Sequence, residues 1–335
     1  MTSRTFWIIL LASVPLAMYW SDIKLPSFVW PSNLRLERNN SHCKEHFFWQ
    51  KIWLTLEVPT KIWQIWNDDP EGDVESIAEL DRFSSKWRSL NPSYQYESLN
   101  KTRGDRYVET KFDDDEAIRR TYKLIQEDWI VRSDFLRYLV LLKEGGVYTD
   151  KDTEPVVPID EWVPSKFRGR TNIVVGIEQD KRVGLPLWKD LPWTVQFAQF
   201  TILTKPNHPI LRKAVDHVIE NMSQFLQTHD LEKGVPQLYF HDVITLTGPR
   251  VFTSAAFDYI YEQTGLKLNG NELSNITEPV LLADVLILPV NSFSSAAPWH
   301  RHLHFIGDVL SIHKWMSSWV PSHPHKFPVE EFYIT

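Results

Sequence analysis

Cysteine is almost absent from this chain of 335 residues, in which Cys43 stands alone. No intrachain disulfide can form, so the fold must be stabilised by its core. A basic stripe is also missing, because 43 acidic residues outnumber 36 basic residues and the net charge is -7. Nucleic-acid-binding surfaces need clustered Lys and Arg to displace phosphate counterions, and we therefore expect no nucleic-acid partner.

Long hydrophobic runs are missing after residue 60, where no apolar stretch approaches 18 residues. One shorter run, Phe6 to Trp20, has no charged residue. It ends in bulky aromatics and lacks the small residues of a cleavage site, which favours an uncleaved anchor over a signal peptide. We expect a cytosolic tail at residues 1–4, a signal-anchor transmembrane segment at residues 5–21, and a lumenal remainder.

Residues 22–55 mix Pro, Asn, Ser, Arg and aromatic residues without a period, which is typical of a stem. In an oxidising lumen Cys43 of this stem can join two subunits into a homodimer, and an inert thiol is the alternative. Four sequons, which begin at Asn39, Asn100, Asn221 and Asn275, permit lumenal glycosylation. The catalytic domain is expected at residues 56–335.

Periodicity within this domain predicts a mixed α/β fold. A β-rich run at residues 58–66 ends in a turn cluster, and the helical spacing of residues 114–144 ends at a glycine pair. Further strands are expected at residues 147–149, 172–177 and 280–288, and further helices near residues 207–228 and 251–264.

Two acidic clusters differ in their chemistry. The cluster Asp113 to Glu116 opens a helical segment, where carboxylates cap free N–H groups. Asp150 and Asp152 instead follow a short strand, and alternation along an extended chain would direct both side chains to one side. Two such carboxylates can hold Mn²⁺ or Mg²⁺ together with substrate phosphates.

Asp134 and Arg137 precede this pair on the expected helix and share one face at a spacing of three residues. One interpretation is a surface ion pair. The other places Asp134 on sugar hydroxyls and Arg137 on phosphate or sugar oxygens.

Glu178 is a further residue that could line a pocket. His300, His302 and His304 could form a zinc-like array on a strand, although a polar surface is the favoured interpretation.

Residues 133–138 (SDFLRY) and 145–152 (GGVYTDKD) resemble the sugar transferases with a D-x-D signature. More narrowly, they are similar to the fungal initiation-specific α-1,6-mannosyltransferases of glycosyltransferase family 32. Shorter matches extend the resemblance to about residues 58–320, and they lie at residues 61–64, 173–178, 205–209, 247–249 and 288–293.

This resemblance implies a GT-A fold, a nucleotide-sugar donor such as GDP-mannose, a Mn²⁺ or Mg²⁺ cofactor, and retention of anomeric configuration. It further implies donor contacts from Trp63, which would stack on the base, and from Asp134, Arg137 and Tyr148. His313, in a late segment similar to the family's C-terminal motif, would join Asp150 and Asp152 as the third metal ligand.

The implied activity is a glycan mannosyltransferase of the Golgi membrane, with type II topology and a role in N-glycan outer-chain synthesis. Two alternatives stay open. One is a mannosyltransferase of inositol-phosphate sphingolipids, whose expected relatives carry extra C-terminal membrane spans. The other is a non-catalytic sugar-binding subunit of a transferase complex.

Overall fold

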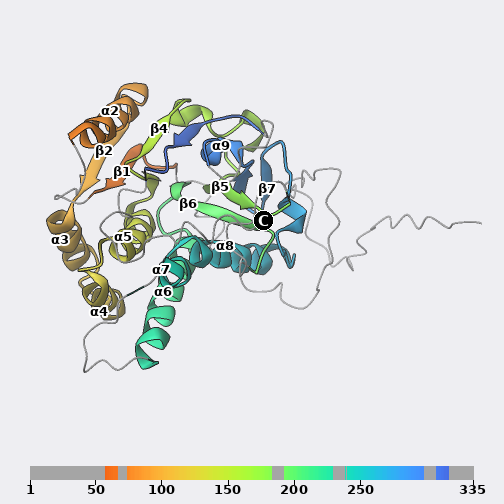
Figure 1. The fold of residues 1–335 in the computed structure, drawn as a ribbon. Helices are drawn as coiled ribbons and strands as arrows, with labels where there is room; N and C mark the ends of the chain where they lie inside the picture. Colours follow the sequence, from red (N-terminus) through yellow and green to blue (C-terminus); the bar gives the residue numbers. More distant parts are fainter. Residues whose placement is uncertain are drawn as a thin grey trace, which may run out of the picture.

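A seven-stranded mixed sheet forms the centre of the protein (Figure 1). The computed structural model describes residues 57–66, 74–182, 192–228, 238, 240–297 and 307–316. The sheet has the strand order β2-β1-β3-β6-β5-β8-β7. Strand β1 is parallel to β2 and β3, and β5 is parallel to β8, whereas β6 is antiparallel to both of its neighbours.

The strands of this sheet are β1 (Lys61–Ile65), β2 (Gln95–Leu99), β3 (Gly146–Thr149), β5 (Ile173–Asp180), β6 (Val195–Thr204), β7 (Val280–Leu282) and β8 (Val285–Leu288). A separate antiparallel pair consists of β4 (Thr153–Pro155) and β9 (Ser311–His313). The helices are α2 (Val74–Leu90), α3 (Lys101–Lys111), α4 (Glu116–Ile125), α5 (Trp129–Glu144), α6 (Pro209–Gln227), α7 (Phe240–Leu246), α8 (Pro249–Thr264) and the short α9 (Asn291–Ser294).

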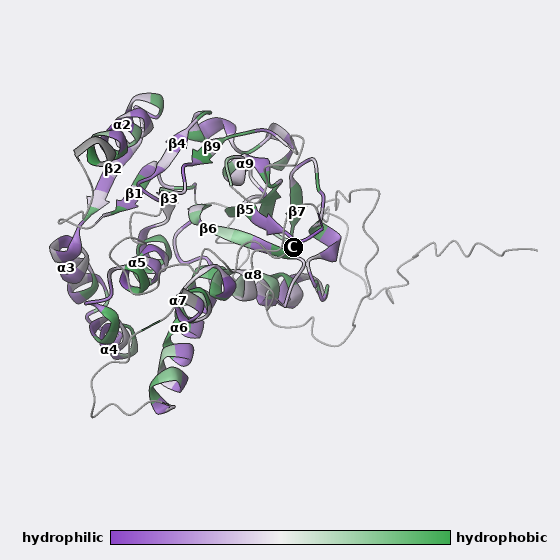
Figure 2. Cartoon of the chain, in the orientation of Figure 1, coloured by the Kyte–Doolittle hydropathy of each residue, from purple (hydrophilic) through white to green (hydrophobic). Residues whose placement is uncertain are grey.

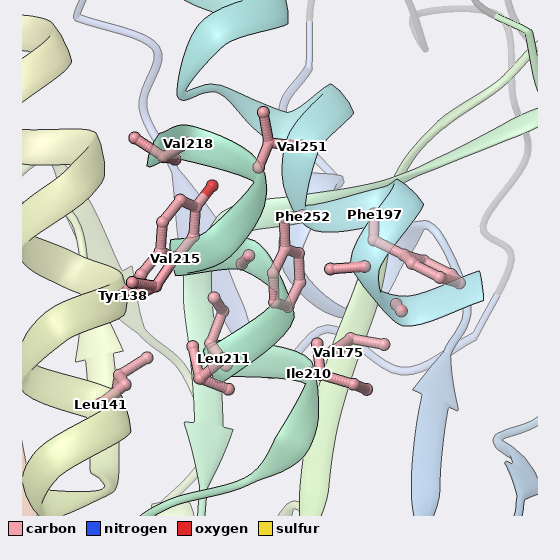
Figure 3. Packing of buried hydrophobic residues seen from close by; sticks show 14 of the residues in the cluster. Tyr138, Leu141, Val175, Phe197, Ile210, Leu211, Val215, Val218, Val251 and Phe252 are labelled. Carbon is pink, nitrogen blue, oxygen red and sulfur yellow. The ribbon is translucent and has the colours of Figure 1, made fainter. Parts of the chain in front are cut away.

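Two hydrophobic clusters cover the two faces of the sheet. The larger cluster lies between the sheet and helices α5, α6 and α8, and Figure 3 shows Tyr138 of α5, Val215 of α6 and Phe252 of α8 pointing into one shared space. The smaller cluster lies on the other face, where Phe293 of α9 packs against Gly176 of β5. A side chain at position 176 would collide with that ring.

Strands β5 and β6 are buried along their whole lengths because helices cover both faces of the sheet. Helices at the edge are amphipathic instead, and α4 carries green and purple on different sides (Figure 2). Helix α5 is exceptional, since every residue from Ile130 to Leu142 is buried. This helix therefore belongs to the core over almost its whole length.

The expected mixed α/β architecture is confirmed, although α2, β2 and α3 were not predicted and three other segments differ from expectation. Residues 114–144 form two helices, because Asp128 accepts hydrogen bonds from two amides of α5 and begins a new helix there. Residues 280–288 form a hairpin, with Ala283 at a φ of 53° between its strands. Strand β6 was not predicted, because its sequence VQFAQFTILT mixes apolar residues with Gln and Thr without the strict alternation of a half-buried strand, although all ten residues are buried.

The acidic cluster at residues 113–116 has the predicted structural role, since the Asp115 side chain accepts a hydrogen bond from the Ile118 amide and caps α4. Other predictions lie outside the described residues, namely the anchor, the stem with Cys43, and the three alternating histidines. No helix among the described residues is long and apolar enough to cross a membrane.

The glycine pair before β3 is required by the backbone. Gly145 and Gly146 have φ values of 65° and 96°, and residues that carry a side chain rarely adopt positive φ. A Cβ atom on Gly146 would also lie 2.6 Å from the carbonyl oxygen of Lys61 on the neighbouring strand. The chain can thus leave α5 and pair directly with β1.

We predict that Gly146→Ala lowers the free energy of unfolding by more than about 2 kcal/mol, because positive φ and a backbone collision add together. Gly169→Ala is the matched control, since Gly169 also has positive φ, at 74°, but a Cβ atom at that position would meet no atom of the described residues within 4 Å. Chemical denaturation of both variants measures the difference. Equal losses would show that the contact with Lys61 has no energetic consequence.

Candidate active site

A tight turn holds Asp150 and Asp152 at the end of β3. The Asp150 amide donates to the Phe200 carbonyl at 2.9 Å, and the Asp150 carbonyl accepts from the Thr153 amide at 3.2 Å and from the Gln64 side chain at 3.1 Å. Alternation predicted an extended segment here, but the structure shows a turn. These hydrogen bonds to the amide and the carbonyl of Asp150 fix the backbone that carries the two carboxylates.

His313 reaches this turn from the far end of the chain. Strand β9 pairs with β4 so that His313 lies opposite Thr153, and its Nε2 is 3.1 Å from Oδ1 of Asp152. The imidazole packs against Phe200 and Trp315, with ring centroids 4.2 and 4.0 Å away. The other carboxylate oxygen of Asp152 accepts from the Met316 amide at 3.0 Å.

These three residues can hold a divalent cation. One ligand atom from each of Asp150, Asp152 and His313 lies within 4.8 Å of the others. Nε2 is the ring nitrogen of His313 that faces Asp152, at 3.1 Å from its Oδ1. Two carboxylate oxygens and an imidazole nitrogen suit Mn²⁺ or Mg²⁺, with room for phosphate oxygens as further ligands.

Arg137 lies beside the turn in a buried network. Its Nη2 is 3.0 Å from Oδ1 of Asp134 and 3.4 Å from Oδ1 of Asp150, and its guanidinium lies 4.9 Å from the centre of the Tyr148 ring. The Tyr148 hydroxyl donates to Asp150 at 2.5 Å. The Asp134–Arg137 pair is thus no surface ion pair, and the structure brings it together with the predicted metal ligands.

Negative charge exceeds positive charge in this region. Burial raises the pKa of Asp134 to about 6 despite the charge of Arg137. Burial also raises the pKa of Glu178 to about 7. The charge of Asp150 adds to this rise, whereas Arg137 and His313 oppose it. For Asp152 burial again opposes ionisation, but the pKa is lowered by the neighbouring His313 and by the hydrogen bond from the Met316 amide. Such an acidic region favours a cation.

Trp63 lies apart from this cluster. Its ring is 3% exposed, packs edge-on against Tyr107, and donates from Nε1 to the Gly145 carbonyl at 3.0 Å. Gly145 precedes β3, whereas Asp150 follows it, so the indole nitrogen points toward the opposite end of the strand. Base stacking by Trp63 remains a prediction, and the described contacts are those of a core residue.

Three polar residues around the site were not assigned roles by the sequence. Gln64 is fully buried and supports the Asp150 carbonyl, while its own oxygen accepts from Ser84. Gln199 and Thr247 donate to Asp134 at 3.2 and 3.1 Å. Gln64 and Thr247 stood in motifs that carried the family resemblance, but only the fold shows which groups they contact.

Residues 78–168 match the family model described as "Glycosyltransferase sugar-binding region containing DXD motif". That segment contains Asp134, Arg137, Tyr148 and both aspartates of the turn. In this segment the chain is similar to the DXD glycosyltransferases. The resemblance inferred from the sequence is thereby confirmed.

Two curated relatives bear the name initiation-specific alpha-1,6-mannosyltransferase. The Schizosaccharomyces pombe protein is 34% identical over 71% of this chain and 57% of its own length. The Candida albicans protein is 29% identical over 70% of this chain and 65% of its own length. The chain therefore spans less than two thirds of either relative.

Among solved structures, the PaToxG glycosyltransferase aligns with 61% of this chain and 70% of its own chain. The sequence identity is 20% and the TM-score is 0.40. These values are too low for any detail of the site to be carried over from that protein.

We predict that Asp152→Asn weakens Mn²⁺ binding at least tenfold, because the substitution removes a charged oxygen ligand while keeping the volume of the side chain. A titration followed by the electron paramagnetic resonance signal of free Mn²⁺, which is lost on binding, measures the affinity. His313→Ala should weaken binding less, since both carboxylates remain.

Asp113→Asn is the control for this measurement, because Asp113 is an exposed acidic residue of the other cluster. Its Mn²⁺ affinity should equal that of the unchanged protein. Loss of binding in Asp113→Asn with retention in Asp152→Asn would move the metal site to residues 113–116 and contradict the assignment made here.

Proposed function

We propose that this protein is a metal-dependent glycosyltransferase of GT-A type that moves mannose from GDP-mannose to a hydroxyl group of a glycan. The observation that carries the proposal is the convergence of Asp150, Asp152 and His313 next to the buried guanidinium of Arg137. The family match at residues 78–168 supports sugar transfer, and the names of the two relatives support the choice of mannose as the sugar.

Each residue of the site has a task in this proposal. Asp150, Asp152 and His313 would hold Mn²⁺ or Mg²⁺, which when bound supplies positive charge to the donor diphosphate. Arg137 lies beside Asp150 and presents its guanidinium to phosphate or sugar oxygens. Tyr148 orients Arg137 and Asp150, since its ring faces the guanidinium and its hydroxyl donates to the carboxylate.

The proposed reaction retains the anomeric configuration. The bond between the anomeric carbon and the diphosphate oxygen breaks, and the acceptor oxygen bonds to the same face of that carbon. The acceptor proton passes to the departing phosphate oxygen, so the balance requires no protein base. Glu178, whose pKa is about 7, is left without an assigned step.

Two other functions are weighed against this one. A sphingolipid mannosyltransferase would use the same donor but a lipid acceptor. A non-catalytic subunit would bind sugar without turnover, which the intact group of Asp150, Asp152 and His313 argues against. We further propose a Golgi membrane location with a lumenal catalytic domain, supported by the uncharged run from Phe6 to Trp20.

We predict Mn²⁺-dependent release of GDP from GDP-mannose by the purified protein, with much slower release of UDP from UDP-galactose and UDP-glucose. Asp152→Asn should reduce the rate about a thousandfold, because lost stabilisation of the leaving group by about 4 kcal/mol has that effect. Asp113→Asn should retain the rate. Binding of GDP-mannose without any release would favour the non-catalytic subunit, and release only from a UDP-sugar would overturn the mannosyl donor.

For the location, we predict that protease added to sealed microsomes leaves residues 56–335 intact, because the membrane separates a lumenal domain from the protease. Detergent should abolish this protection. Complete digestion without detergent would contradict the type II topology while leaving the proposed chemistry untouched.

A further inference from the structure

The carboxylate of Asp134 is surrounded by protein donors. Its Oδ1 accepts from Arg137 at 3.0 Å and from Gln199 at 3.2 Å, and its Oδ2 accepts from the Thr247 hydroxyl at 3.1 Å. Asp134 is 3% exposed and Thr247 is fully buried. The donors come from three elements that are distant in sequence, namely α5, β6 and the corner between α7 and α8.

The same three elements are joined by Tyr138, the residue after Arg137. Its hydroxyl contacts the Gln199 side-chain oxygen and lies 3.0 Å from the Thr247 carbonyl. Its ring stacks on Phe252 of α8 at 6.0 Å between centroids (Figure 3). The α7–α8 corner therefore has fixed contacts with both the helix and the strand that flank Asp134.

We propose that Thr247 and Gln199 are positioning residues for sugar transfer, which hold Asp134 ionised and directed at Arg137 and thereby fix the guanidinium beside Asp150. The proposal rests on the proposed function, because it takes Arg137 to contact the donor. It adds the α7–α8 corner, which has no described contact with Asp150, Asp152 or His313, to the groups that determine activity.

The physical reason is the cost of an ionised carboxylate in the core. A buried charge is tolerated only when it is paired and hydrogen-bonded, and loss of one donor leaves the remaining charge undercompensated. Arg137 has two carboxylate partners, Asp134 at 3.0 Å and Asp150 at 3.4 Å. If Asp134 becomes neutral or turns away, Arg137 has only Asp150 to pair with, and its position relative to the donor changes.

Thr247→Val tests this role, because it keeps the shape of the side chain and removes the donor. We expect kcat/KM for the donor to fall about tenfold or more, as for loss of a hydrogen bond to a charged group. Thr247→Ser keeps the hydroxyl and should stay within about threefold of the unchanged protein. Gln199→Met removes the second donor from a different element and should act in the same direction.

Thr245→Val is the matched control on α7, since the only acceptors of the Thr245 hydroxyl among the described residues are carbonyls of its own helix, with His241 at 2.9 Å. Its kcat/KM should not change. Repeating Thr247→Val in an Arg137→Ala background distinguishes a positioning role of Thr247 from a purely structural one. A positioning role predicts little further loss there, whereas general damage to the core predicts the full loss again.

A crystal structure of Thr247→Val gives a measurement that does not require turnover. We expect Arg137 to have left its position between Asp134 and Asp150. An unmoved Arg137, or equal activities of the Val and Ser variants, would overturn the inference. Absence of turnover in the unchanged protein would instead overturn the proposed function, and the position of Arg137 would still decide the inference.

Discussion

The candidate active site depends on the pairing of buried charges around Arg137. This guanidinium lies between Asp134 and Asp150, and both Asp134 and Arg137 are almost fully buried. A buried ion pair does little for stability on its own, because desolvation offsets most of the attraction. The presence of this pair beside the end of β3 is therefore better explained by the chemistry of the site than by the stability of the core.

The fold meets this constraint by bringing distant segments to one strand end. Asp150 follows β3, which is hydrogen-bonded to β1 on one side and β6 on the other. Strand β1 supplies Gln64 to the Asp150 carbonyl, β6 supplies the Phe200 carbonyl to the Asp150 amide, and β9 supplies His313. The turn is thus fixed by three contacts between segments that are far apart in the sequence. Such rigidity limits the motion of the carboxylates before any ligand binds.

Much of this arrangement could be predicted from local signals. A glycine pair and a short strand placed Asp150 and Asp152 at the C-terminal end of that strand, and the spacing of Asp134 and Arg137 placed both on one helix face. The turn itself was not predicted, because alternation indicated an extended segment. What could not be predicted was burial. Helix α5 has apolar residues on several faces, so periodicity gives no boundary between core and surface, and the ion pair could equally have been exposed. The role of Gln199 could not be predicted either, because β6, the strand that carries it, was not recognised in the sequence.

Helix α5 has two tasks that share one surface. Leu141 and Tyr138 face the packing between α6 and α8, while Asp134 and Arg137 direct charge to the end of β3. Since protein interiors are densely packed, a shift of this helix against α6 or α8 moves the guanidinium as well. The hydrophobic core and the polar network are therefore not independent parts of the molecule. Tyr138 makes the connection explicit, because its ring belongs to the packing and its hydroxyl to the network around Asp134.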